Sequence, residues 1–149
     1  MYQPYSYRSD PGVPAFPDDK AIVLYDGYCS LCSNWVQFVL CRDRQARFRL
    51  LPAQSPLGEA LYRHYGLDPD NHETNLLLEG GLPYFRSESS IRIVSTMGFP
   101  LSLVRLARLL PRFILDRVYE LVASNRLRWF GRRDSCLLTL AGFEDRFIG

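Results

Sequence analysis

Long uncharged hydrophobic runs are absent from this 149-residue sequence. A helix that spans a membrane needs about 20 mostly apolar residues, so we expect no transmembrane segment. The N-terminal region also lacks the apolar stretch that is typical of a secretory signal peptide. These two absences favour a cytoplasmic protein.

Cysteine is sparse as well, with four residues at positions 29, 32, 41 and 136. That number is too small for a scaffold held together by disulfides. Neither a second CxxC nor an HxxxH accompanies Cys29 and Cys32, so a zinc site would lack its usual second pair of ligands. A zinc-binding domain therefore stays an alternative, while we expect no metal and no cofactor. In a reducing cytoplasm, this CxxC pair is more typical of redox chemistry than of a structural bond.

Lysine is nearly missing, because 17 of the 18 basic residues are arginine. The formal net charge of +2 indicates no particular partner. Eight of the arginines lie in 105–133, where only Asp116 and Glu120 oppose them. The basic residues form no dense run and no nucleic-acid motif is present, so we expect no nucleic-acid partner.

Two helices are expected in this arginine-rich part, at 101–110 and from 112 to about 123, separated by Pro111. Our first interpretation is that both helices pack on the domain through an apolar stripe and hold their arginines in water. The alternative is a non-catalytic binding module that uses a basic amphipathic surface. Such a surface would contact an anionic membrane peripherally, or a partner protein.

Hydrophobic periodicity predicts the order β-α-β-α-β-β-α for the first hundred residues. The expected strands are 21–25, 48–51, 75–78 and 82–85, and the expected helices are 31–42, 55–65 and 87–97. Ser55 and Ser87 are the candidate helix caps. The prolines and polar residues of 1–19 predict a flexible leader, 20–137 form the domain, and 138–149 form a tail.

Strands joined through a helix are usually parallel, whereas the two strands around Gly80 and Gly81 should form an antiparallel hairpin. The pattern therefore predicts an α/β fold with a mixed four-stranded sheet. Helices flank this sheet, and the additional C-terminal helices follow it.

The CxxC lies where the first strand ends and a helix begins. Residues three apart on a helix lie on the same side, about 5–6 Å apart. The free N–H groups and partial positive charge of a helix N-terminus lower a thiol pKa. Cys29 is nearer to the helix end, so we expect it to be the more exposed sulfur and the nucleophile, and Cys32 to resolve the mixed disulfide. Asp26 is either the acceptor of a proton from Cys32 or a turn-forming residue.

The spacing Asp26-x-x-Cys29-x-x-Cys32 behind a short strand resembles the DCC family of predicted thiol-disulfide oxidoreductases. Further similar segments run through about 20–137. They are Trp35-Val36-Gln37-Phe38, Phe48-Arg49-Leu50-Leu51-Pro52-Ala53-Gln54-Ser55, Tyr84-Phe85-Arg86-Ser87-Glu88-Ser89, Asn125-Arg126, Trp129-Phe130-Gly131-Arg132-Arg133-Asp134 and Cys136.

This resemblance implies a thioredoxin-like fold and the redox use of Cys29 and Cys32 on a protein or small-molecule thiol or disulfide. Ordinary thioredoxins place a cis-proline before the third strand, and this chain has Glu73-Thr74 there. Ser30-Leu31 also replace Gly-Pro between the two cysteines.

The sequence also suggests accessory residues near its C-terminal end. Arg132 and Arg133 are candidates for lowering the pKa of Cys136 or for binding an anionic substrate. Cys136 is a candidate third redox thiol. The alternative is a solvated basic loop that happens to contain a cysteine.

Overall fold

We describe the protein from a computed structural model, over residues 1–72, 74–132, 134 and 140–148. The sheet has four strands in the order β2-β1-β3-β4. The strands are β1 (Ala21–Tyr25), β2 (Phe48–Pro52), β3 (Leu76–Glu79) and β4 (Leu82–Phe85). β1 pairs with β2 in parallel, and the pairs β1–β3 and β3–β4 are antiparallel. The predicted mixed sheet is confirmed.

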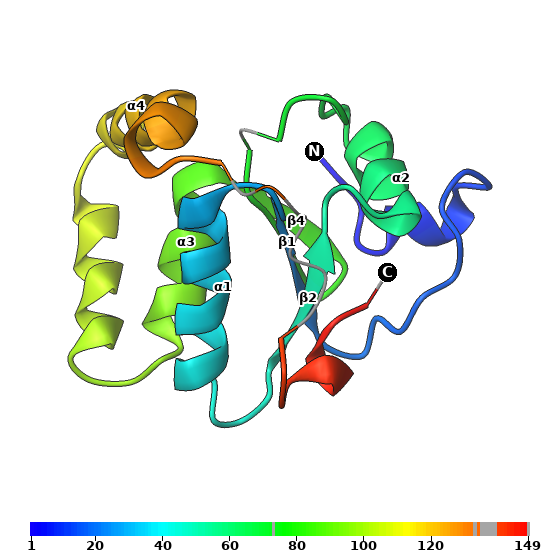
Figure 1. The fold of residues 1–149 in the computed structure, drawn as a ribbon, viewed down its shortest axis with the longest axis horizontal. Helices are drawn as coiled ribbons and strands as arrows, with labels where there is room; N and C mark the ends of the chain where they lie inside the picture. Colours follow the sequence, from blue (N-terminus) through cyan, green and yellow to red (C-terminus); the bar gives the residue numbers. More distant parts are fainter. Residues whose placement is uncertain (73, 133, 135–139, 149) are drawn as a thin grey trace.

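Helices cover both faces of this sheet (Figure 1). The α-helices are α1 (Ser30–Arg42), α2 (Pro56–His64), α3 (Arg86–Ser95) and α4 (Arg112–Phe130). Three 3-10 helices are η1 (Ser6–Ser9), η2 (Leu101–Leu109) and η3 (Glu144–Arg146). α1 and α3 lie on one face, α2 lies on the other, and α4 lies across one end (Figure 1). The order of elements through α3 is that of a thioredoxin-like fold.

Strand β1 is buried on both faces and supplies both halves of the core. Ile22 and Leu24 pack toward α2, where they contact a cluster that contains Leu61. Val23 and Tyr25 point the other way, into the cluster formed with α1 and α3. This alternation explains why the strand reads as a continuous apolar run.

One of the two predicted helix caps is present. Ser55 precedes α2, and its hydroxyl accepts a hydrogen bond from the Gly58 N–H at 3.1 Å. Ser87 is not a cap, because β4 runs directly into α3 and the helix begins at Arg86. Ser87 lies in the first turn and donates a hydrogen bond to Asp116 of α4 at 2.5 Å instead.

The segment 1–19 packs on the domain rather than extending as a flexible leader. Tyr7 is only 3% exposed, belongs to the core cluster on the α2 side, and donates a hydrogen bond to Asp18 at 3.0 Å. Ser6 contacts the His64 ring at the end of α2. The packing of this segment on the core depends on the scattered aromatic residues Tyr5, Tyr7 and Phe16, whose irregular spacing shows neither a helical nor a strand period.

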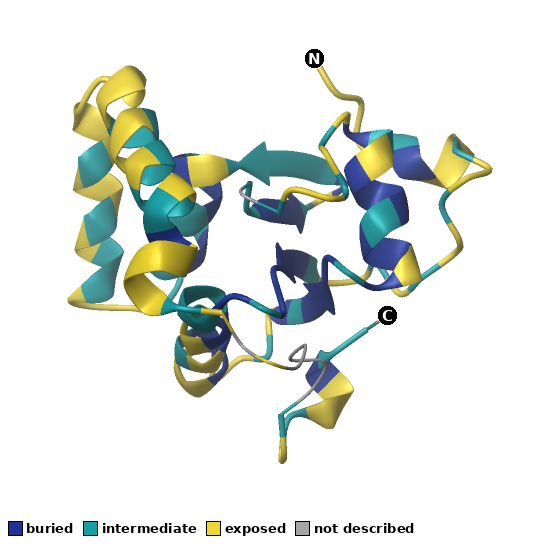
Figure 2. Ribbon diagram, turned by 45° about the horizontal axis from the view of Figure 1, so that its top comes forward, coloured by how far each residue is buried: buried dark blue, intermediate teal, exposed yellow. Residues whose placement is uncertain are grey.

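The C-terminal helices differ most from the expectation. α4 continues to Phe130, beyond the expected end near Ala123, and 101–109 form a 3-10 helix with no buried residue. η2 lies beside α3, and α4 contacts α1 and α3. Much of the outer side of both helices is exposed (Figure 2). Leu101, Val104 and Ala107 of the expected apolar stripe are half-buried and Arg105 and Arg108 are exposed, so the expected packing is present except at Leu110, which is exposed.

Candidate active site

Cys29 occupies the N-cap of α1, directly after the turn that follows β1. Its sulfur accepts a hydrogen bond from the backbone N–H of Cys32 at 3.4 Å. The Cys32 thiol also forms a hydrogen bond with the Cys29 sulfur. Both residues are free thiols. The predicted placement of the two sulfurs together at a helix N-terminus is confirmed.

The two thiols have opposite acidities. The pKa of Cys29 is lowered to about 6, mainly by the hydrogen bond from the Cys32 thiol. The Cys32 backbone N–H and the positive charge of Arg126 lower this pKa further, while burial and Asp26 oppose them. The pKa of Cys32 is raised, first by its hydrogen bond to Cys29 and then by burial. At neutral pH the pair therefore carries one negative charge, and this charge resides on the Cys29 sulfur.

The expected exposure of Cys29 is wrong. Cys29 is 0% exposed, whereas Cys32 is half-buried. The covering segment is Gly131–Arg132, which follows α4 and forms a β-bridge with Cys29. Gly131 has φ 82° and ψ 172°, a conformation that glycine adopts readily and other residues avoid. It turns the chain back over the start of α1, and its carbonyl accepts a 3.4 Å hydrogen bond from Ser30.

Asp26 is buried and fully engaged at the end of β1. One carboxylate oxygen accepts hydrogen bonds from the Tyr28 N–H at 2.9 Å and from the Gln54 amide at 2.6 Å. The other oxygen forms an ion pair with Arg126 at 3.0 Å, and both side chains are 8% exposed. The turn-forming role of Asp26 is thus present in the structure.

Arg126 reaches the site from α4, one hundred positions after Asp26. Its guanidinium also donates to the His72 carbonyl oxygen at 2.6 Å. A buried guanidinium is costly unless it is paired and hydrogen-bonded, and here two groups from distant segments compensate it. Arg126 therefore ties α4 to both β1 and the loop before β3.

Thr74 and Asn75, and not a proline, directly precede β3 beside the site. Tyr62 of α2 donates a hydrogen bond to the Thr74 carbonyl at 2.7 Å. The Asn75 N–H donates to the Tyr119 hydroxyl of α4 at 2.8 Å. Side chains from two helices thus hold the backbone that a cis-proline would shape in thioredoxins.

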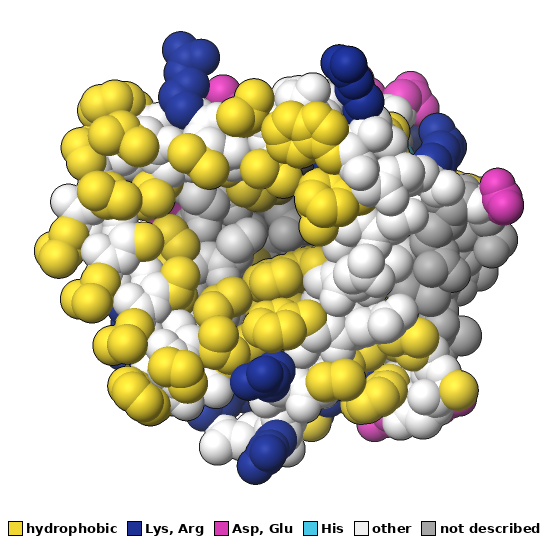
Figure 3. Space-filling view, turned by 60° about the vertical axis from the view of Figure 1, so that its left-hand side comes forward, with side chains coloured by type: hydrophobic (Ala, Val, Ile, Leu, Met, Phe, Trp, Pro, Cys, Tyr) yellow, Lys and Arg dark blue, Asp and Glu magenta, His cyan; other side chains and the backbone are white. Residues whose placement is uncertain are grey.

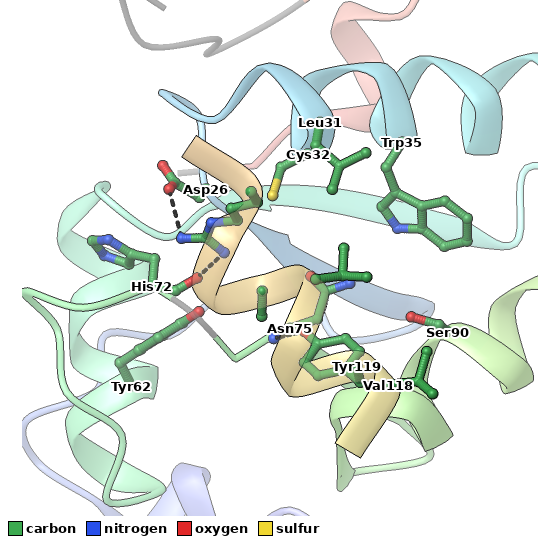
Figure 4. A pocket seen from close by; sticks show the side chains of 13 residues that line it. Asp26, Leu31, Cys32, Trp35, Tyr62, His72, Asn75, Ser90, Val118 and Tyr119 are labelled. Atoms are coloured by element: carbon green, nitrogen blue, oxygen red, sulfur yellow. Dashed lines mark hydrogen bonds and ion pairs between the residues drawn. The ribbon is translucent and has the colours of Figure 1, made fainter. Parts of the chain in front are cut away.

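A cavity of about 270 Å³ opens beside this loop and reaches Cys32. Figure 4 shows the Cys32 sulfur turned into it, with Trp35 and Tyr119 also on its wall. Leu31 and Val118 add apolar surface, while Asp26 and His72 line its polar end. Burial lowers the pKa of His72, which favours the neutral imidazole.

Of the accessory residues that the sequence suggests, only Arg132 lies within the described residues. The Arg132 guanidinium lies over the Tyr28 ring, 5.2 Å from its centroid. Arg133 and Cys136 fall outside the described residues. Cys41 is exposed. Within the described ranges, no three His, Cys, Asp or Glu side chains are grouped to hold a metal ion.

Sequence reasoning did not select Arg126, Gln54, Trp35 or His72 as site residues. Arg126 resembles any of the surface arginines of its helix, because nothing in the local pattern marks it as buried. Three of the four, however, lie within or beside the segments that carry the family resemblance. That correspondence was the signal available from the sequence.

Comparison with known proteins identifies relatives of this chain. Residues 23–132 match the family model described as DCC1-like thiol-disulfide oxidoreductase. An uncharacterized protein, YuxK, of Bacillus subtilis is 32% identical over 127 residues, which is 85% of this chain and 93% of the relative. The chloroplastic DCC family protein At1g52590 of Arabidopsis thaliana is 37% identical over 122 residues, 81% of this chain and 71% of the relative. No solved structure matches the chain. None of the helices in the described ranges is long and apolar enough to cross a membrane.

Proposed function

Because the chain belongs to the DCC1-like thiol-disulfide oxidoreductase family, we propose that it exchanges thiols and disulfides through Cys29 and Cys32. The observation that carries this proposal is the position of Cys29 at the N-cap of α1, where its sulfur accepts a hydrogen bond from the Cys32 N–H at 3.4 Å. In agreement with this position, the pKa of Cys29 is lowered to about 6, mainly by the hydrogen bond from the Cys32 thiol. Only the thiolate is a nucleophile, and at neutral pH this sulfur is mostly ionised.

In the first step, the Cys29 thiolate attacks one sulfur of a substrate disulfide. A Cys29–substrate disulfide forms, the substrate S–S bond breaks, and the leaving thiolate takes a proton from water. In the second step, Cys32 loses its proton and attacks the Cys29 sulfur, which releases the second substrate thiol. Two electrons pass from the pair to the substrate, and the reverse sequence oxidises a dithiol.

Cys29 must be uncovered before it can attack. The alternative, a first attack by Cys32 from the cavity, would require moving the proton from Cys32 to Cys29 against their opposite pKa shifts. Each pKa unit of that difference costs about 1.4 kcal/mol. The cover is held in part by the hydrogen bond from Ser30 to Gly131, which is long at 3.4 Å. We therefore assign the first attack to Cys29.

Asp26 is our candidate for the proton acceptor of Cys32 in the second step. Both side chains line the same cavity, and the Asp26 carboxylate is ion-paired with Arg126. Asp26→Asn keeps the size and the hydrogen-bonding oxygen of the side chain. We expect this variant to release the substrate thiol more slowly at neutral pH while its first attack continues.

Trapping of mixed disulfides tests the exchange. With Cys32→Ser, the first attack proceeds and the Cys29–substrate disulfide accumulates, so mass spectrometry should find partners attached to Cys29. Cys29→Ser should trap nothing, and Cys41→Ser serves as the control for an exposed thiol. Equal trapping on Cys32 in the Cys29→Ser variant would reverse the assigned order. The absence of adducts on either sulfur would reject the proposed activity.

A second candidate function is peripheral membrane binding through η2 and α4. Twelve large hydrophobic side chains between Phe99 and Phe130 are exposed, and we call this surface the η2–α4 face. Its members are Phe99, Leu103, Leu106, Leu109, Leu110, Phe113, Ile114, Val118, Leu121, Leu127, Trp129 and Phe130. Figure 3 shows apolar side chains gathered over this side of the molecule, with basic side chains at its edges.

The charge around this face favours an anionic bilayer as the occupant. Exposed arginines at 105, 108, 112, 117, 128 and 132 surround the apolar residues, and the same stretch has only Asp116 and Glu120 as acids. An apolar face with a basic rim and a tryptophan is typical of helices that lie in the membrane interface. Monomeric soluble proteins rarely expose an apolar patch larger than a few hundred Å².

Vesicle sedimentation tests this candidate with the double variant Cys29→Ser, Cys32→Ser. We expect binding to phosphatidylglycerol vesicles, much weaker binding to phosphatidylcholine vesicles, and no effect of the cysteine changes. Leu109→Asp together with Leu121→Asp should abolish binding. Equal affinity for both lipids, or a stable dimer that hides the face, would reject membrane binding.

The cellular compartment stays a prediction. The cytoplasm was inferred from the lack of a long apolar run and of a signal-peptide stretch, whereas the Arabidopsis relative is named as a chloroplastic protein. Expression of a tagged chain in its native cell, followed by fractionation, would decide the compartment.

A further inference from the structure

The cavity beside Cys32 has the walls of a binding site for an aromatic group. Its volume of about 270 Å³ is near the lower limit of small-molecule pockets, which begin at about 300 Å³. Leu31, Trp35, Val118 and Val122 present apolar surface to the space, and Cys32 contributes its sulfur. A single substituted ring matches this size and lining.

Three residues that line this cavity each have a buried nitrogen atom that lacks a hydrogen-bond partner among the described residues. These atoms are Nε1 of Trp35, Nε2 of His72 and Nε of Arg126. Arg126 is only 7% exposed, and its other two guanidinium nitrogens are engaged by Asp26 and the His72 carbonyl. Buried polar groups are nearly always satisfied, so their concentration at one cavity points to a missing ligand.

The hydrogen-bonding character of these nitrogen atoms indicates which groups a ligand must have. An indole N–H and a guanidinium N–H are donors without acceptor capacity. The ligand must therefore bring oxygen acceptors, such as a carbonyl, in addition to its ring. The charge of Arg126 is already compensated by Asp26, so the cavity does not demand a full negative charge.

We propose that this cavity is the substrate pocket, and that it selects disulfides carrying an aromatic ring next to a carbonyl acceptor. This inference rests on the proposed thiol-disulfide exchange. The sulfur of Cys32 lies on the cavity wall and is hydrogen-bonded to that of Cys29. A disulfide whose ring occupies the cavity therefore brings its sulfurs next to Cys32, and the Cys29 thiolate beside it attacks once Gly131–Arg132 no longer covers it.

Ring binding can be measured without any redox step. The chain has two tryptophans, so Trp129→Phe leaves Trp35 as the only tryptophan and as a fluorescent reporter on the cavity wall. In this background we expect N-methylbenzamide to change the Trp35 emission saturably, with a Kd on the order of 1 mM. N-methylacetamide, which has the acceptor but no ring, should leave the emission unchanged.

A matched pair of variants on α4 tests whether N-methylbenzamide binds in the cavity. Ala123 lines the cavity, so Ala123→Phe fills it and should weaken N-methylbenzamide binding at least tenfold. Ser124 is exposed and absent from the lining, and Ser124→Phe should bind like the parent. Should Ala123→Phe fail to fold, Ala123→Leu gives the same test with a smaller side chain.

Turnover of two related disulfides tests the selection. N,N′-dibenzoylcystamine and N,N′-diacetylcystamine share the disulfide and the carbonyls and differ in the ring. With dithiothreitol as reductant, we expect kcat/KM to be at least tenfold higher for the dibenzoyl compound. Ala123→Phe should abolish this preference and Ser124→Phe should keep it.

The two proposals can fail separately. Equal turnover of both disulfides, with no effect of Ala123→Phe, would overturn the pocket and leave thiol-disulfide exchange standing. Turnover of neither would overturn the exchange, and Trp35 emission would still decide whether the cavity binds the ring. An unchanged Trp35 emission with N-methylbenzamide would overturn the pocket directly.

Discussion

The acidity of Cys29 can be changed by one substitution that leaves its position intact. The hydrogen bond from the Cys32 thiol is the largest contribution to the low pKa. Cys32→Ala removes this donor, while the backbone N–H at position 32 and the charge of Arg126 remain. We therefore expect the pKa of Cys29 to rise well above 6, toward the ordinary thiol value, without reaching it.

The magnitude follows from the ionised fraction. A thiol with a pKa of about 6 is about 90% thiolate at pH 7, whereas one at the ordinary value of 9.0 is about 1% thiolate. Full loss of the shift would thus reduce the reactive form about ninety-fold. Because the folded pKa is lowered, the thiolate stabilises the fold above the ordinary thiol pKa, and this contribution is lost as the pH falls through about 6.

Ultraviolet absorbance of the thiolate measures this pKa without requiring access to the buried sulfur. The difference between the parent and Cys29→Ser across the pH range isolates the signal of Cys29. Cys32→Ser is the matched control, because its hydroxyl can still donate and should keep the midpoint low. A parent midpoint near the ordinary thiol value would refute this account, as would identical titrations of Cys32→Ala and Cys32→Ser.

Three further substitutions test the packing that positions the site, each by urea unfolding. Arg126→Met leaves the Asp26 carboxylate buried and without its ion pair, and should lower the free energy of unfolding by about 3–5 kcal/mol. The control Arg128→Met, on the exposed side of α4, should change it by less than about 0.5 kcal/mol. Equal losses in the two variants would contradict the buried ion pair. Tyr7→Ala should cost about 3 kcal/mol, since Tyr7 is 3% exposed, and unchanged stability would restore the flexible leader. Leu61→Ala, at 0% exposure, should cost about 2–5 kcal/mol, and a loss below about 1 kcal/mol would contradict its place in the core.

The parts of the fold that the sequence predicts correctly are those that depend on local patterns of hydrophobic and turn residues. β1, β4 and the end of α1 at Arg42 lie where the periodicity and the turn residues place them. The CxxC position at a helix N-terminus follows from the same kind of pattern. The hairpin was predicted because Gly80 and Gly81 adopt positive φ angles at little cost.

The errors concern contacts between residues far apart in the chain. Arg126 has the same local pattern as its exposed neighbours, and only the fold brings it to Asp26. Cys29 was expected to be exposed because a helix end is usually open, but Gly131–Arg132 returns from α4 to cover it. Our first interpretation did not predict how many apolar side chains of the η2–α4 face are exposed, because amphipathic periodicity does not reveal which partner, within the chain or outside it, covers an apolar side.

The ion pair between Asp26 and Arg126 also orders events during synthesis. A growing chain that has emerged only as far as α3 contains both cysteines, the strand and the helix that carry them, but not the guanidinium that acts on Cys29. The covering residues Gly131 and Arg132 emerge later still. The thiol pair therefore acquires its final acidity and its cover only when nearly the whole polypeptide has been made. Until α4 docks, the nascent chain carries these two sulfurs uncovered and without the charge of Arg126.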